Sequence, residues 1–239
     1  MPDRRAHRGM DPQDPGLFNA GTLPGLRAAV SDLSFLFGRA YAVDSALKVV
    51  GDRYQLRARQ RAAVLRSACA AERATARASR MLAPEALRGQ TLCLDGFNVL
   101  TTLEVALSGG VLLIGRDGAL RDIAGVHGSY RPVEETAAAL ELVREFTNTW
   151  GVARCEWYFD QPVSNSGRLC ARVREVAERD GLAWTASVVP DPDAVLMQSA
   201  GVVASADARI LDAAVRWVDL TRCVVQTRVP GAYLIDLSV

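Results

Sequence analysis

The chain has 239 residues, of which 49% are hydrophobic and 23% charged, which is typical of a soluble globular protein with a sizeable core. No apolar run approaches the ~20 residues of a membrane span and no signal-peptide apolar region opens the chain, so we expect a cytoplasmic protein without membrane contact. Five cysteines without a C-x-x-C pair, and only two histidines, argue against a zinc site, a disulfide framework or a histidine-based triad.

The net charge of +1 is distributed unevenly along the chain. Residues 1–91 contain 15 basic and 8 acidic residues, a balance of +7, whereas the remainder contains 13 basic and 19 acidic residues, a balance of −6. This asymmetry is expected when one part of a protein holds a polyanion and another holds cations.

The first 90 residues are predicted to be helical after a flexible tail. Residues 1–23, rich in Pro and Gly, are expected to be that tail, and residues 24–90 an Arg-rich helical domain. Apolar residues at three- and four-residue steps between Leu26 and Phe37 predict a first helix. A second is expected from Asp44 until Gly51 and Asp52 interrupt it, and a long third helix from Tyr54 to Met81.

The expected long helix carries eight arginines and one acid, Glu72, between Arg53 and Arg80. Arg53, Arg57 and Arg61 would share one face at i, i+4 spacing. One interpretation is a phosphate-binding surface in which Arg57 and Arg61 contact substrate. The other is a solvated face, or a face that pairs with the acidic second half.

Residues 91–239 alternate between strand-like and helix-like segments, which predicts an α/β domain with a parallel sheet and helices on both faces. A hairpin is expected between Val111 and Ile123, and an edge strand at Tyr233–Leu237. The other strands are expected at 92–94, 155–159, 184–189 and 202–204, and the helices at 98–107, 133–150, 167–179, 192–199 and 208–215.

Several of these strands end in or beside an aspartate, at Asp95, Asp160, the Asp191/Asp193 pair and Asp207. In parallel α/β sheets ligands bind at the carboxyl ends of the strands, so these side chains are candidates for one site. Carboxylates at one edge repel one another, and a divalent cation is the usual means of neutralising them. Each aspartate has a simpler alternative role as a helix cap or a turn residue.

Two further groups of polar residues are ambiguous. Asn165 and Arg168 lie in a polar loop before a helix, where they could hold a phosphate or simply belong to the helix cap. Glu104 lies about 240° around a helix from Asn98 and is expected to be structural. His127 is expected to be a hydrogen-bonded structural residue rather than a general base.

The order of these motifs resembles that of PIN-like nucleases, especially the NYN branch. Asp95-Gly96-Phe97-Asn98 is similar to their D-G-x-N opening, and Val203-Ala204-Ser205-Ala206-Asp207 to their closing strand-serine-aspartate element. The resemblance implies a three-layer PIN-like domain over residues 91–239 and makes Asp95, Asp160, Asp193 and Asp207 catalytic and metal-binding. It also implies that Glu134 or Glu135 supplies a second acid, for which we choose Glu135, and that Asn98 and Ser205 help to form the site.

The function implied is a Mg²⁺- or Mn²⁺-dependent nuclease, with endoribonuclease activity expected first and RNA expected as a partner before DNA. A homodimer is compatible with the sequence. The alternative is an inactive PIN-like module that binds nucleic acid or protein. The whole chain also resembles a prokaryotic family known as domain of unknown function 434, which brings no assigned activity.

Overall fold

The computed structural model describes residues 7–124 and 130–238, so His127 lies outside the described part. The first part of the chain forms five helices: α1 Asp14–Leu17, α2 Leu23–Gly38, α3 Val43–Arg53, α4 Ala58–Ser67 and α5 Ala71–Ala78. The helix expected between Leu26 and Phe37 is confirmed as α2. The expected break at Gly51 is wrong, since α3 continues to Arg53.

The segment expected as one helix from Tyr54 to Met81 is two helices, α4 and α5. Gln55 adopts a positive φ of 50° before α4, and the backbone is extended at Ala68 and Ala70 after it. In the second break the Cys69 amide donates to the Ser34 hydroxyl of α2 at 3.1 Å. A contact distant in sequence therefore decides the break, and no local Gly or Pro marks it.

The described residues of the expected tail are packed against the body of the protein. Asp14 and Phe18 are buried, and the buried Arg8 guanidinium donates to Glu104 at 2.5 Å and lies over the Tyr130 ring at 4.8 Å. Glu104 also accepts from the hydroxyls of Tyr130 and Thr136. The structural role expected for Glu104 is confirmed, and residues 7–23 differ from the flexible segment that we expected.

The second part of the chain is built on a four-stranded parallel sheet of order β5-β4-β1-β6. These strands are β1 Thr91–Asp95, β4 Arg154–Asp160, β5 Trp184–Val189 and β6 Val202–Ala204. The helices are α6 Gly96–Leu107, α7 Thr136–Thr149, α8 Ser166–Asp180, α9 Pro192–Met197, α10 Ala208–Ala213 and α11 Leu220–Arg228, and a short 3-10 helix, Pro84–Leu87, precedes β1. The α/β fold with a parallel sheet is thus confirmed, while α11 was not predicted.

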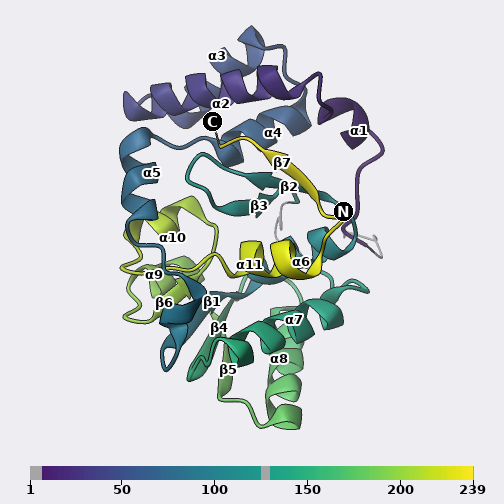
Figure 1. Ribbon diagram of the computed structural model, residues 1–239, viewed down its shortest axis with the longest axis vertical. Helices are drawn as coiled ribbons and strands as arrows, with labels where there is room; N and C mark the ends of the chain where they lie inside the picture. Colours follow the sequence, from purple (N-terminus) through teal and green to yellow (C-terminus); the bar gives the residue numbers. More distant parts are fainter. Residues whose placement is uncertain (1–6, 125–129, 239) are drawn as a thin grey trace.

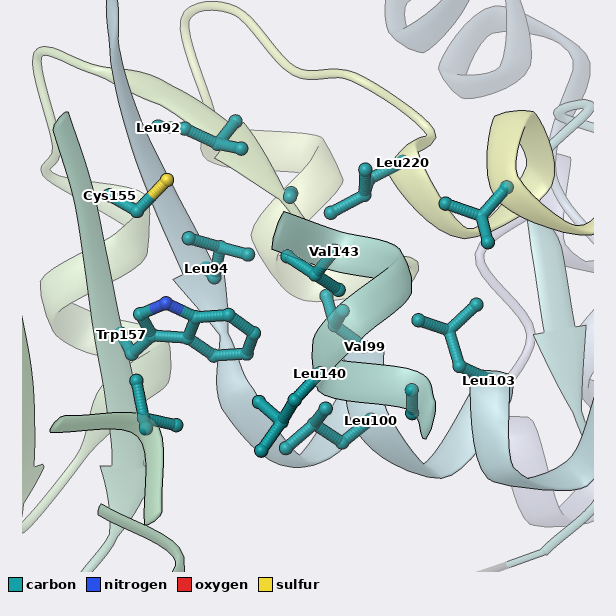
Figure 2. Close-up of a cluster of buried hydrophobic side chains, with 14 of the residues drawn as sticks. Leu92, Leu94, Val99, Leu100, Leu103, Leu140, Val143, Cys155, Trp157 and Leu220 are labelled. Carbon is teal, nitrogen blue, oxygen red and sulfur yellow. The ribbon is translucent and has the colours of Figure 1, made fainter. Parts of the chain in front are cut away.

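Alternate side chains of β1 enter two different cores. Leu92 and Leu94 join the core formed with α6, α7, α8 and α11, whereas Cys93 joins a smaller core formed with α9 and α10. Figure 2 shows the larger core, in which Trp157 of β4 lies beside Leu94 and faces the side chains of α6 and α7. Successive side chains of a strand point to opposite faces of the sheet, so both faces of β1 are buried.

A second sheet joins the helical segment to the rest of the chain. Its order is β3-β2-β7, with β2 Val111–Ile114 antiparallel to β3 Leu120–Asp122 and parallel to β7 Tyr233–Asp236, so the expected hairpin and edge strand are confirmed. Figure 1 shows α2 and α4 above this sheet and α6 below it. Val111 and Leu113 pack with the N-terminal helices, while Leu112 packs with α6. The hairpin strand β2 thus has one face in each core.

Candidate functional site

Asp95 lies where β1 passes into α6 without an intervening loop. It is the last residue of the strand and the N-cap of the helix, and its carboxylate accepts a hydrogen bond from the Asn98 amide at 3.4 Å. Gly96 permits this sharp junction, because a Cβ on residue 96 would lie 2.2 Å from the ring of Phe159 in β4. The strand end, the glycine and the helix start together fix the direction of the Asp95 carboxylate.

A hydrogen-bond network connects Asp95 to the segment after β6. The Ser205 hydroxyl donates to Asp95 Oδ2 at 2.8 Å and accepts from the Asp207 amide at 3.0 Å. Asn98 Oδ1 accepts from the Ala206 amide at 2.9 Å. The structure thus brings together four of the residues singled out in the sequence, Asp95, Asn98, Ser205 and Asp207, and ties them to two neighbouring strands.

Three more aspartates lie at the same sheet edge. Asp160 ends β4, opposite Val189 of β5, and Asp191 caps α9 by accepting from the Ala194 amide at 3.0 Å. Asp193 lies in the first turn of α9, as its sequence position predicted. Asp207 caps α10 by accepting from the amides of Arg209 and Ile210 at 2.7 and 3.2 Å. The capping roles considered from the sequence are therefore present alongside the clustering.

The carboxylates of this edge influence one another's ionisation. The pKa of Asp95 is raised to about 7, mainly by burial, which the hydrogen bonds from Ser205 and Asn98 oppose, and in smaller part by the charges of Asp207 and Asp193. The pKa of Asp193 is raised by burial, then by Asp207, with smaller contributions from Asp191 and Asp160. Burial and then Asp191 raise the pKa of Asp160. We call Asp95, Asp160, Asp191, Asp193 and Asp207 the acidic edge.

Little positive charge on the described chain compensates the acidic edge. Arg209, which was not singled out in the sequence, donates to Asp193 at 3.4 Å. Within residues 7–124 and 130–238, no arginine forms an ion pair with Asp95, Asp160 or Asp207. Arg209 lies two residues after Asp207 in the sequence, and this proximity was the signal that could have identified it as a neighbour of the acidic edge.

The donor chemistry of the acidic edge fits a hard divalent cation, because every candidate ligand is a carboxylate oxygen. The repulsion that raises the pKa values of Asp95 and Asp193 is the kind that a cation relieves. The side chains as they stand are not arranged as a finished site, since the described residues contain no group of three or more His, Cys, Asp or Glu side chains poised to hold an ion. Asp95, Asp193 and Asp207 are the side chains that such a cation would draw together.

The side-chain bond of Glu135 is to the N-terminal segment and not to the acidic edge. Its Oε1 bonds to the His7 ring at 2.6 Å, while its Oε2 is buried without a hydrogen-bond partner, and Glu134 is largely exposed at 3.8 Å from the same ring. The pKa of Asp160 is raised by burial and by Asp191 rather than by either glutamate. The role given to Glu135 in the sequence remains a prediction without support from its contacts.

The polar loop before α8 is held mainly by structural bonds. Asn165 adopts a positive φ of 68° and its side-chain amide donates to the Tyr130 carbonyl at 2.7 Å, while the Ser166 hydroxyl donates to the Asp160 carbonyl. Arg168 is exposed on the first turn of α8. Of this pair, Arg168 is therefore the residue whose side chain faces solvent.

Most arginines of the helical segment pair with aspartates. Arg61 binds Asp52 at 2.7 Å, so the Arg61 side chain is engaged within the helical segment, whereas Arg57 is exposed at the start of α4. Arg77 is buried between Asp117 and Asp212, at 2.6 and 2.7 Å. Burial alone would raise the pKa of Asp117, but Arg121 and Arg77 outweigh it and lower the pKa to about 2. Arg77 therefore pairs with acids of the second half of the chain, which was one of the interpretations considered from the sequence.

A cleft of about 570 Å³ lies between the helical segment and the acidic edge. Six of its lining residues define it: Phe37, Tyr41, Arg66, Arg73, Asn98 and Asp207. We call it the arginine cleft. Since Asn98 and Asp207 belong to the candidate site, the cleft connects that site to the Arg-rich segment. The charge asymmetry of the sequence was the signal for this arrangement, but it did not indicate Tyr41, Arg66 or Arg73.

The fold and site define an α/β protein with an acidic edge on a parallel sheet, and no described helix is long and apolar enough to cross a membrane. The chain belongs to the family described as Domain of unknown function (DUF5616), which matches residues 84–223, more than half of the chain. Residues 25–80 match the family Protein of unknown function (DUF434). The sequence led us to expect this family over the whole chain, but the match covers the helical segment alone.

An uncharacterized protein of Methanocaldococcus jannaschii is 27% identical to this chain over 186 residues, which cover 78% of this chain and 88% of the relative. The similarity therefore extends over both the helical and the α/β segments. No solved structure matches the chain.

Proposed function

We propose that this protein is a metal-dependent nuclease, most readily an endoribonuclease that uses Mg²⁺ or Mn²⁺. The observation that carries the proposal is the placement of Asp95, Asp193 and Asp207, from separate elements, at one end of the parallel sheet, where the charges of Asp207 and Asp193 help to raise the pKa of Asp95. Repelling carboxylates destabilise a fold, so their retention at a sheet edge indicates a use for a concentrated negative charge. The ordered resemblance to PIN-like nucleases supports the same conclusion.

Each residue of the site has a role in this proposal. Asp95, Asp193 and Asp207 would hold the cation, with Asp160 beside them. When bound, the cation would supply Lewis-acid stabilisation of the charge on a phosphodiester. The Ser205 hydroxyl orients the Asp95 carboxylate, and Asn98 holds the backbone before Asp207 through the Ala206 amide. Both are positioning residues.

Substrate binding is assigned to two basic side chains of the arginine cleft. Arg66 and Arg73 line the arginine cleft together with Asp207. Guanidinium groups bind phosphate oxygens with paired donors, so these two arginines suit the phosphates of a nucleic acid. Arg168 and Arg57 are exposed and remain candidate contacts for phosphates farther along a bound nucleic-acid strand.

The test is cleavage by the purified full chain of single-stranded RNA, hairpin RNA, single-stranded DNA and duplex DNA, each with Mg²⁺, Mn²⁺ or EDTA. We expect metal-dependent cleavage of RNA that Asp207→Asn reduces by more than about 100-fold, because even outer-shell partners of metal ligands are worth 10–100-fold. Asparagine also caps helices, so α10 should be preserved. Asp44→Asn, in an exposed first turn of α3, is the control.

A second candidate is a non-catalytic binding module on the same fold. The helix-capping bonds of Asp95, Asp191 and Asp207 favour it, because they give these side chains a structural role that needs no reaction. In that case no substrate would be cleaved under any metal condition, while Asp207→Asn would leave RNA binding unchanged.

A further inference from the structure

The arginine cleft has one polar end and one apolar side. Asn98 and Asp207 form the end next to the acidic edge, whereas Phe37, Tyr41, Val43 and Leu65 form the side contributed by α2, α3, α4 and the turn between α2 and α3. A volume of about 570 Å³ lies within the range of small-molecule and cofactor sites, about 300–1,000 Å³. The cleft is therefore of a size for one nucleotide-sized group rather than for a helix of nucleic acid.

The apolar side contains an aromatic ring that the fold leaves uncovered. The exposed fraction of Tyr41 is 57%, and that of neighbouring Val43 is 48%. Aromatic rings in this situation provide stacking surfaces for unpaired bases. Tyr41 therefore offers the cleft a surface on which an unpaired base can stack.

The cleft holds one exposed guanidinium that can reach a phosphate group, that of Arg73. Arg66, Arg73, Arg77 and Arg121 line it, their aspartate partners are Asp117, Asp122 and Asp212, and Asp207 supplies a fourth carboxylate, so the four guanidinium charges are balanced. Asp212 forms ion pairs with both Arg77 and Arg73, each at 2.7 Å. Arg77 is buried, whereas the side chain of Arg73 is 68% exposed. Arg73 is thus free to turn one edge of its guanidinium towards a ligand.

We infer that the arginine cleft binds one unpaired nucleotide of a single-stranded RNA, with the base against Tyr41 and a phosphate near Arg73 and the acidic edge. The inference deepens the proposed function and rests on it for the choice of ligand. Paired bases cannot enter, because within a duplex both faces of each base are covered by stacking. The cleft therefore selects single strands and places the held nucleotide beside Asp207.

The test is the affinity of the full chain for a fluorescent single-stranded RNA, measured by anisotropy in EDTA so that cleavage does not contribute. We expect Tyr41→Ala to weaken binding by about fivefold or more, because stacking on one aromatic ring is worth at least about that factor. Tyr41→Phe should retain binding. Phe35→Ala, at a ring 60% exposed on α2 but outside the cleft, should have no effect.

A second pair of variants and two competitors test the phosphate and the base separately. Arg73→Gln should weaken binding, whereas Arg154→Gln, an exposed arginine at the opposite end of the large sheet, should not. Adenosine 5′-monophosphate should compete with the RNA, and ribose 5-phosphate should not. Unchanged melting temperatures confirm that each variant is folded.

Two results would overturn the inference: blunt duplex RNA that binds as tightly as the single strand, or full affinity in Tyr41→Ala. The second result would assign the Tyr41 surface to a protein partner instead. Cleavage is measured separately with Mg²⁺ or Mn²⁺. If the protein cleaves RNA but Tyr41→Ala binds normally, the nuclease proposal stands and nucleotide binding in the cleft is rejected. If Tyr41→Ala weakens binding but no substrate is cleaved, nucleotide binding in the cleft stands and the nuclease proposal is rejected.

Discussion

The side chain of Asp95 is placed at some expense to the stability of the fold. Its neighbours Asp193 and Asp207 repel it, its burial disfavours ionisation, and two hydrogen bonds offset these effects only in part. In the folded protein the pKa is about 7, against an ordinary 3.8. Between these two values the folded state binds more protons than the unfolded state, so stability falls as pH rises.

Replacing this charge should stabilise the protein. We expect Asp95→Asn to raise the free energy of unfolding by about 2–4 kcal/mol at pH 8, since each unit of pKa shift corresponds to about 1.4 kcal/mol. The gain should shrink as pH falls from about 7 to 3.8, because only below 3.8 is the wild-type carboxyl protonated in both the folded and the unfolded state. Urea titrations at pH 4.5, 6 and 8 measure it, and a gain that is independent of pH would contradict the assignment of the strain to charge.

At the same scale, sequence alone indicated that four aspartates follow strands or begin helices, and the structure places them there. Asp95, Asp160, Asp193 and Asp207 were found because a strand end followed by a turn or a helix start is a local pattern. Glu135 was chosen by resemblance, and its position against His7 depends on where the N-terminal segment packs. Tyr41 and Arg73 join the site only through the fold, since their neighbours in the sequence carry no signal of a cleft.

The segments between elements show why some boundaries were predictable. β5 was predicted at residues 184–189 and is found there, because its bounds depend on local alternation and a following Pro-Asp turn. The break between α4 and α5 was not predictable, because it is made by the bond from Cys69 to Ser34. Helix α11 was missed although Asp219 caps it by accepting from the Arg222 amide at 2.9 Å. Its apolar face is short, so periodicity was weak.

Helix α5 is attached to the rest of the molecule through Arg77. The guanidinium donates to Asp117 in the hairpin turn, to Asp212 in α10 and to the Ala208 carbonyl beside Asp207. Removing one partner of a buried ion pair leaves the other charges uncompensated.

We expect Arg77→Met to lower the free energy of unfolding by about 3–5 kcal/mol, the usual result of breaking a buried pair. Arg73→Gln is the matched control, because Arg73 binds the same Asp212 from an exposed position and should change stability by no more than about 1 kcal/mol. Chemical denaturation of both variants provides the measurement. Equal effects would show that burial of Arg77 does not decide its contribution.

The two halves of the chain share a core at the scale of the whole molecule. Val111, Leu113, Ile235 and Leu237 of the second half pack with α2, α3 and α4, so neither half closes its apolar surface alone. The sequence suggested a helical domain beside an α/β domain, because each half has its own periodicity. The shared core depends on the β2–β3 hairpin, whose local sequence predicts two strands but not the helices against which they pack.

A single cooperative transition is therefore expected for the full chain. All four tryptophans lie at or after residue 150, so tryptophan fluorescence reports on the second half alone. We expect Leu33→Ala, in the buried face of α2, to shift the fluorescence midpoint together with the far-UV circular dichroism midpoint, with a loss of about 2–5 kcal/mol. Val49→Ala, at an exposed position of α3, should shift neither. A fluorescence midpoint unaffected by Leu33→Ala would mean that the halves unfold independently.

The place of β7 has a consequence for how the protein is made. Strand β7 closes the small sheet beside β2, and Arg27 of α2 donates to the Asp236 carbonyl, 209 residues later in the chain. At about 5–20 residues per second, translation takes roughly 10–40 s to span that interval. During this time the first helices emerge from the ribosome with their sheet-facing side uncovered, so the newborn chain passes through a stage that is open to chaperones or to self-association before its closing strand arrives.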